Sequence, residues 1–241
     1  MAIAIRFRAT VALIGRFPVL AGVDLDVDRG QIVLLQGANG AGKTSLLRAC
    51  AGLLPIVAGQ AEVLGHDLTR DRRSVRPEVG LLGHASGLYD DLSVEDNVTF
   101  SVRAGRGNRD AVAPALARLS LDGRLRAVAV GRLSAGQRRR VALAALVARA
   151  PRLWLLDEPH AGLDAEHRDL LDGIIRDAVA GGSTVVMASH ERERATALAG
   201  RLLTMAGGQV RHEEEGGTEG RPVPSGAFSP SPAPAERAHV A

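Results

Sequence analysis

The sequence predicts an α/β domain built on a mostly parallel sheet, to which an antiparallel β subdomain and an inserted helical subdomain are added. Short apolar runs at 32–35, 153–156 and 184–188 indicate strands that are buried on both faces. Segments with helical spacing lie between these runs, and strands that alternate with helices are typical of a parallel sheet. Strict alternation of apolar and polar residues at 23–28 instead indicates a strand with one solvated face.

The expected elements follow in a regular order, each bounded by a turn, a cap or a helix-breaking residue. Ser93 is the expected N-cap of a mostly helical region that has acidic residues in its first turn. Pro151 ends the longest helix, and Gly207-Gly208 indicate a hairpin. The predicted strands are 23–28, 32–35, 79–82, 153–156, 184–188, 202–205 and 209–211. The predicted helices are 45–54, a stretch from 93 to about 119 broken at 105–108, 135–150 and 165–180.

Composition divides the chain into one domain and a tail. Residues 1–211 are predicted to form the domain, with the helical subdomain inserted at about 86–135. Acidic residues and then mostly Gly, Pro, Ser and Ala fill 212–241, which is predicted to be a disordered tail. No apolar run approaches the roughly 18 residues of a membrane span, and the first residues lack a secretory segment. We therefore expect a cytoplasmic protein that reaches a membrane only through a partner.

Lysine occurs once in this chain, at Lys43, although there are 30 basic residues and the formal net charge is +3. Because an ammonium and a guanidinium differ in shape and hydration, this usage indicates a specific role for Lys43. The arginines are dispersed, which favours solvated helix faces over a nucleic-acid surface, and we expect no nucleic-acid partner. The densest run, 138–140, is either a solvated helix face or a partner contact. The single cysteine, Cys50, is expected to be a buried thiol.

A glycine-rich loop between a predicted strand and a predicted helix carries the strongest functional signal. Residues 37–44 read GANGAGKT and match the pattern G-x-x-x-x-G-K-[ST]. Such a loop points backbone N–H groups at phosphate oxygens, and the helix N-terminus favours the negative charge. Lys43 is predicted to act on the β- and γ-phosphates of ATP in catalysis, and Thr44 to ligate Mg²⁺. The predicted nucleotide-binding residues are Gly37, Ala38, Asn39, Gly40, Ala41, Gly42, Lys43, Thr44 and Ser45.

Two carboxylates, Asp157 and Glu158, follow the apolar run 153–156. Ligands bind at the carboxyl ends of strands in open α/β sheets, so both side chains are expected near the glycine-rich loop. Asp157 is predicted to hold the Mg²⁺ shell, as the carboxylate at such a strand end does in phosphate-loop enzymes. Glu158 is predicted to orient and deprotonate the attacking water. Together with the loop, this pair predicts the core of a P-loop NTPase.

A third motif, LSAGQ at 133–137, opens the predicted helix 135–150. A capping role explains Ser134 but does not explain Gly136 and Gln137 beside it. Over roughly residues 5–211 the sequence resembles the ABC ATPase family, whose signature is L-S-G-G-Q; here Ala135 replaces a glycine. The resemblance implies that Ser134, Gly136 and Gln137 bind the γ-phosphate of ATP held by a second copy of the chain. The active form would then be a homodimer in which each site is shared.

The resemblance also assigns residues outside these three motifs. Asp164, in the string AGLD, resembles the D-loop aspartate that links the two sites, and His190 matches the switch histidine that contacts γ-phosphate and the catalytic water. His84 stands where the family has a glutamine that touches Mg²⁺ and couples the nucleotide to the membrane partner, so it is a candidate metal ligand. The family's adenine-stacking aromatic is replaced by Ile14. Either Phe17 stacks on adenine instead or the base is held by apolar contact alone, and GTP is then expected to compete.

Family resemblance implies an Mg²⁺-dependent ATPase that acts on transmembrane permease subunits from the cytoplasmic face of a membrane. Several strings, including the Gly83-His84 pair and the residues around the LSAGQ motif, are most similar to those of haem-exporter ATPases of cytochrome c biogenesis. The alternatives are the ATPase of a drug, lipid or polysaccharide exporter and a soluble ABC protein that acts on ribosomes or DNA. The absence of inserted arms and of an aromatic-basic platform disfavours the soluble protein. Glu158 argues against a further alternative, a nucleotide-binding regulator without catalysis.

Overall fold

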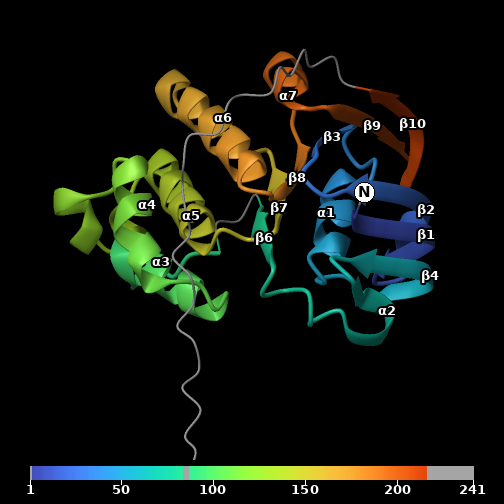
Figure 1. Ribbon diagram of the computed structural model, residues 1–241, viewed down its shortest axis with the longest axis horizontal. Coiled ribbons are helices and arrows are strands. Elements are labelled where there is room, and N and C mark those ends of the chain that lie inside the picture. The colour runs from blue at the N-terminus through green and yellow to red at the C-terminus, as the bar shows by residue number, and fades with distance from the viewer. Residues whose placement is uncertain (1, 84–86, 216–241) are drawn as a thin grey trace, which may run out of the picture.

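The computed structural model describes residues 2–83 and 87–215 of the chain. Two sheets stand side by side, and most of the helices lie beyond the larger one (Figure 1). The strands are β1 (Ile3–Ile14), β2 (Phe17–Asp28), β3 (Ile32–Gln36), β4 (Ile56–Val63), β5 (His66–Asp67), β6 (Val79–Leu82), β7 (Leu153–Asp157), β8 (Thr184–Ala188), β9 (Arg201–Ala206) and β10 (Gln209–Glu215). The helices are α1 (Lys43–Cys50), α2 (Leu68–Asp71), α3 (Val94–Ala104), α4 (Val112–Arg118), α5 (Ala135–Arg149), α6 (Ala165–Ala180) and α7 (Arg192–Leu198).

The larger sheet has the strand order β10-β9-β3-β8-β7-β6. All of its pairings are parallel except that of β9 with β10, the hairpin predicted from Gly207-Gly208. The smaller sheet has the order β2-β1-β4-β5 and is antiparallel throughout. The predicted combination of a mostly parallel sheet with an antiparallel β subdomain is therefore present.

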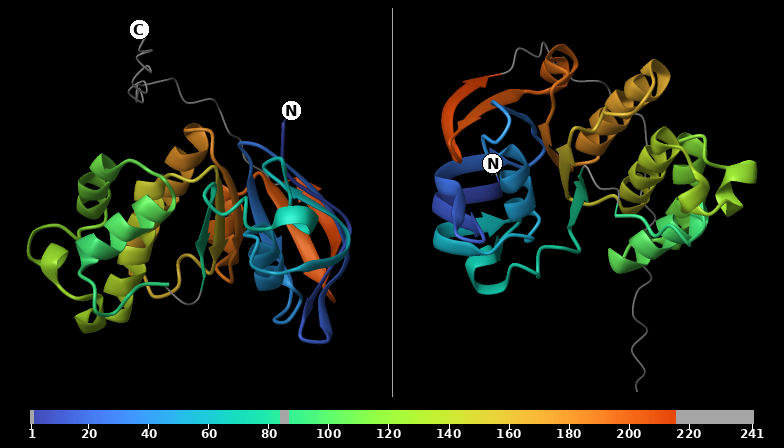
Figure 2. Two further views of the ribbon diagram at one scale, coloured as in Figure 1. Left: turned by 90° about the horizontal axis from the view of Figure 1, so that it is seen from below. Right: turned by 180° about the vertical axis from the view of Figure 1, so that it is seen from behind.

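Both faces of the larger sheet are covered, as the apolar runs predict. On β7, Leu153 and Leu155 belong to the hydrophobic core shared with α1 and the small sheet, whereas Trp154 and Leu156 belong to the core shared with α5 and α6. Successive residues of a strand point to opposite faces, so the four residues 153–156, which lie between two cores, are all apolar, and the only polar residue of the strand is Asp157 at its end. Figure 2 shows α1 between the two sheets and the other large helices on the far side.

The chain between β6 and β7 is largely helical, and α5 is the helix on which the others pack. α3 and α4 both contact α5, and the core between them is made of small and branched apolar residues such as Val98 and Leu116. Ser93 caps α3 as predicted, with its Oγ accepting a hydrogen bond from the backbone N–H of Asp96 at 3.1 Å. Three short 3-10 turns, Arg109–Ala111, Gly123–Ala127 and Val130–Arg132, complete the region.

The structure differs from the expectation in two places. β10 continues through Glu215, so the segment 212–215, expected to begin the disordered tail, pairs with β9 instead. Residues 216–241 lie outside the described part of the chain. The predicted strands and helices also include no counterpart of β1, β4, β5, α2 and α7. The run 56–63 contains Gly59 and has only Ala61 and Val63 buried, so it lacks a long alternating pattern.

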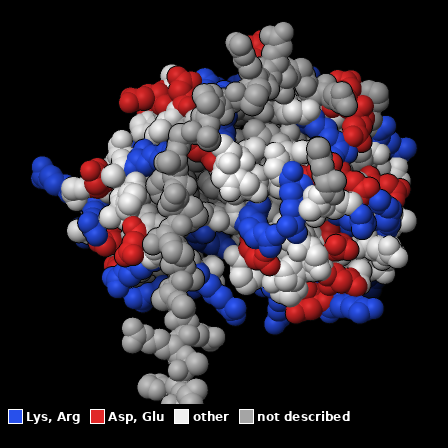
Figure 3. All heavy atoms as spheres, viewed as in Figure 1, with Lys and Arg blue, Asp and Glu red and all other residues white. Residues whose placement is uncertain are grey.

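Among the described residues, no helix is both long and apolar enough to cross a membrane. On the face drawn in Figure 3, basic and acidic side chains are interspersed over most of the visible surface. Several arginines are paired with carboxylates, for example Arg126 with Glu95 and Arg138 with Asp90. Part of the surface arginine among the described residues is thus paired with neighbouring acids.

Candidate functional site

The loop between β3 and α1 curls around the first turn of α1. Its first residue, Gly37, has a φ of 138°, and a Cβ there would lie 2.3 Å from the carbonyl oxygen of Met205 on β9. Only glycine fits this position, because any side chain would collide with the neighbouring strand. The loop ends at Gly42, which caps α1, and Lys43 is the first helical residue. The predicted strand–loop–helix arrangement for phosphate binding is therefore built as the motif requires.

Lys43 and Thr44 direct their side chains to different partners. Lys43 is 9% exposed, and its Nζ donates to the carbonyl oxygens of Gly37 and Ala38 at 2.7 and 3.1 Å. The Thr44 Oγ1 donates to Asp157 Oδ2 at 2.7 Å. Hence the ammonium lies inside the loop, and the two predicted metal ligands lie next to each other.

The donor set fits a magnesium ion. Mg²⁺ prefers oxygen ligands and is usually held by one or two protein side chains together with water and phosphate oxygens. Thr44 and Asp157 supply a hydroxyl and a carboxylate within hydrogen-bond distance of each other. The part of the chain that the structure describes contains no group of three or more His, Cys, Asp or Glu that would form a protein-only metal cage. His84, the third predicted ligand, lies outside the described residues.

Glu158 stands at the carboxyl end of β7 in an unusual backbone conformation, with a φ of 48°. Its N–H donates to the carbonyl oxygen of Ala188 on β8 at 2.8 Å. Its carboxylate accepts a hydrogen bond from the backbone N–H of His190 at 3.0 Å, and the His190 Nε2 lies 3.5 Å from the other carboxylate oxygen. The two predicted catalytic side chains are therefore adjacent although they come from different strands.

These residues share one cleft of about 640 Å³. It is lined by residues 39–45 of the loop, by Asp157, Glu158 and His190, and by Pro18, Val19, Gly207 and Gly208. The last four were not predicted as site residues. Gly207-Gly208 was recognised as a turn, but only the fold shows that the turn lies against the loop, where the Gly208 N–H donates to the Ala41 carbonyl oxygen at 3.0 Å.

The signature residues lie elsewhere. Ser134 caps α5 in a reciprocal capping box, in which its Oγ accepts from the Gln137 N–H at 3.2 Å and its own N–H donates to Gln137 Oε1 at 2.9 Å. Together with Gly136 and Asp164 they line a separate recess of about 200 Å³. Within one chain, the structure thus does not bring the signature residues or Asp164 to the cleft that holds Lys43.

Asp164 is tied to the signature helix through a histidine that the sequence reading did not single out. Its Oδ1 accepts from the backbone N–H of His167 at 2.9 Å and lies 2.7 Å from His167 Nδ1. The other ring nitrogen of His167 lies 3.2 Å from an Arg140 Nη1. The backbone N–H of His167, and then its imidazole, hold the pKa of Asp164 below its usual range. This carboxylate is therefore kept ionised beside the recess.

Phe17 lies at the turn between β1 and β2, opposite Ile14, and is 77% exposed. The following residues, Pro18 and Val19, line the cleft, whereas Phe17 itself does not. In this structure Phe17 is therefore beside the cleft, and its stacking on adenine remains a prediction. Cys50 is buried as expected, and burial raises the pKa of its thiol to about 12, which makes it unreactive at neutral pH.

The three arginines of the run 138–140 have different environments, and only Arg139 is buried. Arg139 is 9% exposed, so it is neither a solvated helix residue nor available to a partner. Arg138 pairs with Asp90 at 2.8 Å, and Arg140 donates to the carbonyl oxygen of Leu119 at 3.0 Å. Successive helical residues point about 100° apart, so each arginine reaches a different segment of the protein.

Comparisons with known proteins agree with this geometry. Residues 20–161 match the family model described as ABC transporter. The chain is 41% identical over 189 residues to the cytochrome c biogenesis ATP-binding export protein CcmA of Xanthomonas axonopodis pv. citri, with 78% of this chain and 87% of that protein covered. It is 40% identical over 185 residues to the protein of the same name from Bordetella bronchiseptica, covering 76% and 82% of the two chains.

Solved structures confirm the predicted fold class. A dimeric ATP-binding cassette, MJ0796, in a post-hydrolysis state with ADP and Pi, superimposes with a TM-score of 0.80 at 22% identity, covering 88% of this chain and 98% of that one. The ATP-binding subunit of another ABC transporter superimposes with a TM-score of 0.82, also at 22% identity, covering 88% and 90%. The loop, the carboxylates and the signature helix therefore occur in this chain in the fold that such cassettes have. The chain belongs to the ABC transporter family and is one of its ATP-binding subunits.

Proposed function

We propose that this protein is the Mg²⁺-dependent ATPase subunit of the haem exporter of cytochrome c biogenesis. The observation that carries the ATPase assignment is the single cleft in which Lys43, Thr44, Asp157, Glu158 and His190 meet. The choice of exporter is supported by about 40% identity to proteins named for cytochrome c biogenesis export. The transported molecule itself would contact the membrane subunits, so this chain supplies the motor.

Each residue of the cleft has a distinct task in phosphoryl transfer. Loop N–H groups and the Lys43 ammonium would hold the phosphates and the charge that develops on them. When bound, Mg²⁺ would be held by Thr44 and Asp157 and would neutralise the phosphate oxygens. Glu158 would accept a proton from the attacking water, and His190 would contact the γ-phosphate. The 3.0 Å hydrogen bond from the His190 N–H keeps the Glu158 carboxylate beside that histidine.

The separate recess supports a homodimer with shared sites. Ser134, Gly136 and Asp164 cannot reach ATP in the cleft of their own chain, since they line a different cavity. In a head-to-tail pair of two-fold symmetry, each recess would face the cleft of the other copy. The N-terminus of α5 would then stabilise the γ-phosphate from the second chain.

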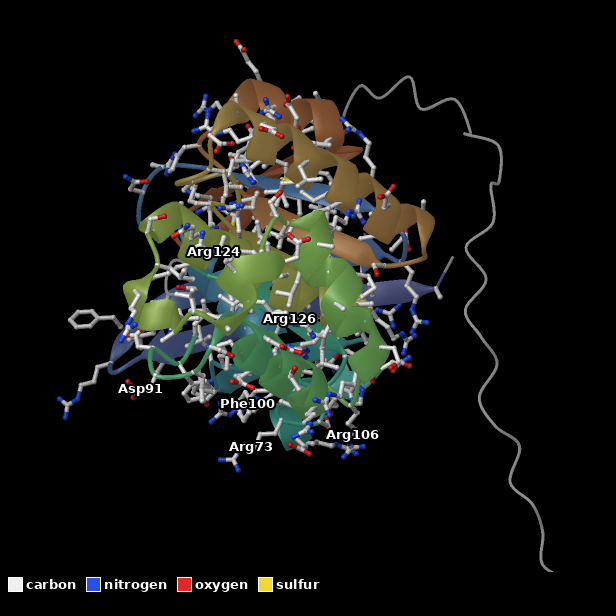
Figure 4. The ribbon with its side chains drawn as sticks, turned by 90° about the vertical axis from the view of Figure 1, so that its left-hand side faces the viewer. Arg73, Asp91, Phe100, Arg106, Arg124 and Arg126 are labelled. Carbon is white, nitrogen blue, oxygen red and sulfur yellow. The ribbon has the colours of Figure 1, made fainter. Side chains whose placement is uncertain are left out.

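A groove between α3 and β6 is the surface we assign to the membrane permease subunit. It has a volume of about 470 Å³, and its lining includes Arg73, Arg76, Tyr89 and Phe100. Tyr89 and Phe100 form an edge-to-face pair with ring centroids 5.1 Å apart, yet they are 52% and 49% exposed. Figure 4 shows Phe100 and Arg73 at the same end of the molecule. Exposed aromatics beside arginines suit a short permease segment with apolar and acidic side chains, presented at the cytoplasmic face of the membrane.

GTP is expected to be hydrolysed by this protein, with a kcat/KM at most about 100-fold below that of ATP. Outside the phosphate loop and the catalytic side chains, the cleft is lined by Pro18, Val19, Gly207 and Gly208, whose side chains have no hydrogen-bonding groups. An apolar surface cannot distinguish the edges of adenine and guanine, whereas a hydrogen-bonded site would reject the wrong base by about 10⁴-fold. Steady-state turnover with both nucleotides measures the ratio of kcat/KM values, and a preference for ATP above about 100-fold would contradict this account.

The proposed function is tested by affinity capture of the protein from solubilised native membranes, with identification of the co-purified chains. Recovery of membrane subunits of cytochrome c biogenesis supports the proposal. Recovery of a different permease supports the assignment as a transport ATPase and overturns the haem assignment. Recovery of ribosomal proteins, or of no membrane protein, overturns the transport assignment while leaving the ATPase assignment in place. The matched control is a Tyr89→Ala, Phe100→Ala variant, which is expected to lose the membrane subunits because it lacks the aromatic pair of the groove.

A further inference from the structure

We propose that Arg139 is a positioning residue that holds the catalytic loop after β7, and Glu158 in particular, in the conformation used for hydrolysis. The proposal rests on the assignment of Glu158 as the base that activates water. Arg139 does not line the cleft with Lys43 and would act only through the backbone of Glu158 and its neighbours.

The contacts of Arg139 are unusual in number and kind. Its Nη2 donates to the carbonyl oxygens of Asp157 and Glu158 at 3.2 and 2.5 Å, and its Nε donates to that of Pro159 at 3.4 Å. Its Nη1 donates to the carbonyl oxygen of Gly83, just past β6, at 2.7 Å. One side chain on α5 therefore binds three consecutive carbonyl groups of the catalytic loop and one from the neighbouring strand end.

Glu158 needs such support because its backbone is strained. A φ of 48° is rare for a residue with a side chain, and it persists only where the surroundings determine it from several sides. The N–H of Glu158 is held by Ala188 on β8, and its carbonyl group is held by Arg139. These two anchors fix both sides of the residue and so fix the direction in which the carboxylate leaves the backbone.

The shape of the guanidinium explains why an arginine is used here. The guanidinium is largely buried, and burial lowers the pKa of Arg139, an effect that the carboxylates of Asp157 and Glu158 oppose. Its planar fork presents five N–H donors in fixed directions, which matches several carbonyl groups at once. A lysine would bring a comparable charge but cannot span the distance from Gly83 to Pro159 with separate donors. We therefore expect the geometry of the fork, more than the charge, to matter.

Through its hydrogen bond to Gly83, Arg139 also connects Glu158 to the end of β6. Gly83 directly follows β6, and Leu81 and Leu82 of β6 line the groove assigned to the permease. A movement of this strand end would pull on Nη1 of Arg139, while Nη2 of the same rigid guanidinium holds Glu158. Arg139 thus provides a short physical connection between the permease groove and the base.

Arg139→Gln is expected to lower the kcat for ATP by about 10- to 100-fold, the usual cost of removing a group that orients a catalytic residue. The Kd for ATP should stay within about twofold, since Arg139 does not line the cleft. In a Glu158→Gln background the same substitution should change single-turnover hydrolysis by less than about twofold, because there is no base left to position. Arg139→Lys should give an intermediate kcat, and it serves as the test variant if Arg139→Gln does not fold.

Arg201→Gln is the matched control, because it removes another largely buried guanidinium that lines neither the cleft nor the permease groove. Arg201 lies on β9, where its Nη1 donates to the carbonyl oxygen of Asp26 at 2.5 Å and its Nε lies 2.6 Å from a carboxylate oxygen of Glu213. It should lower the melting temperature comparably and leave kcat within about twofold of wild type. Equal kcat in wild type and both Arg139 variants would overturn the proposal. So would a double variant of Arg139→Gln and Glu158→Gln whose loss in single-turnover rate equals the product of the losses of the two single variants. If Glu158→Gln alone leaves turnover unchanged, the assignment of the base fails instead.

Discussion

Glu158→Gln is expected to lower ATP turnover by about 10²- to 10⁴-fold, the contribution of a general base, while ATP still binds. The amide keeps the size of the side chain and can still accept the 3.0 Å hydrogen bond from the His190 N–H, so the loop should keep its shape. It cannot accept a proton from water. In the proposed dimer the γ-phosphate is held between the two copies, so a variant that cannot cleave it should accumulate as an ATP-bound dimer.

Two measurements check this expectation. Phosphate release gives the turnover, and size-exclusion chromatography with and without Mg-ATP gives the oligomeric state. Glu62→Gln is a suitable control because Glu62 is exposed on β4, outside the cleft, and the same substitution there should change neither measurement. Turnover of Glu158→Gln within threefold of wild type would show that another group activates the water.

Lys43→Arg is expected to lower ATP turnover by about 10²- to 10³-fold, nearly as much as Lys43→Ala, although the positive charge is kept. The ammonium lies inside the loop, where it donates to the carbonyl oxygens of Gly37 and Ala38, and its third N–H would be left for a phosphate oxygen. A planar guanidinium is larger and cannot make this set of bonds without opening the loop. The single lysine in an arginine-rich chain is consistent with that requirement.

Arg48→Lys provides the matched control for Lys43→Arg. Arg48 is exposed on the same helix, α1, so exchanging the two kinds of cation there should leave turnover unchanged. Nucleotide affinity, measured by the change in fluorescence of a labelled ATP analogue, should fall for Lys43→Arg and not for Arg48→Lys. Full activity of Lys43→Arg would mean that charge alone is needed at this position.

Much of the fold could be predicted because its signals are local. Ser93, Ser134 and Pro151 mark helix ends whose hydrogen bonds or sterics involve only their near neighbours. The buried strands were recognisable because burial on both faces demands continuous apolar residues. β4 and the seven-residue helix α7 were missed because one is buried at few positions and the other is too short for a clear helical period.

In the candidate site, too, the features that depend on neighbouring residues could be predicted from the sequence. The phosphate loop is a contiguous motif whose chemistry depends on local backbone shape, and it could be recognised from eight residues. The roles of Arg139, His167 and Gly207-Gly208 depend instead on segments that meet only in the folded chain. Arg139 in particular resembles its neighbours in sequence, and only its burial against the loop after β7 distinguishes it.

The bond between Thr44 and Asp157 joins residues that are 113 positions apart in the chain. Closing a loop of that length costs conformational entropy before any contact within the site is gained. Mg-ATP that is held by both Thr44 and Asp157 would bind only the fully folded domain. Its binding would therefore stabilise that state over every partly folded one by mass action. Neither half of the chain alone would be expected to retain the bound nucleotide. Nucleotide binding is therefore expected to stabilise the folded domain against partly folded states in which Thr44 and Asp157 are apart.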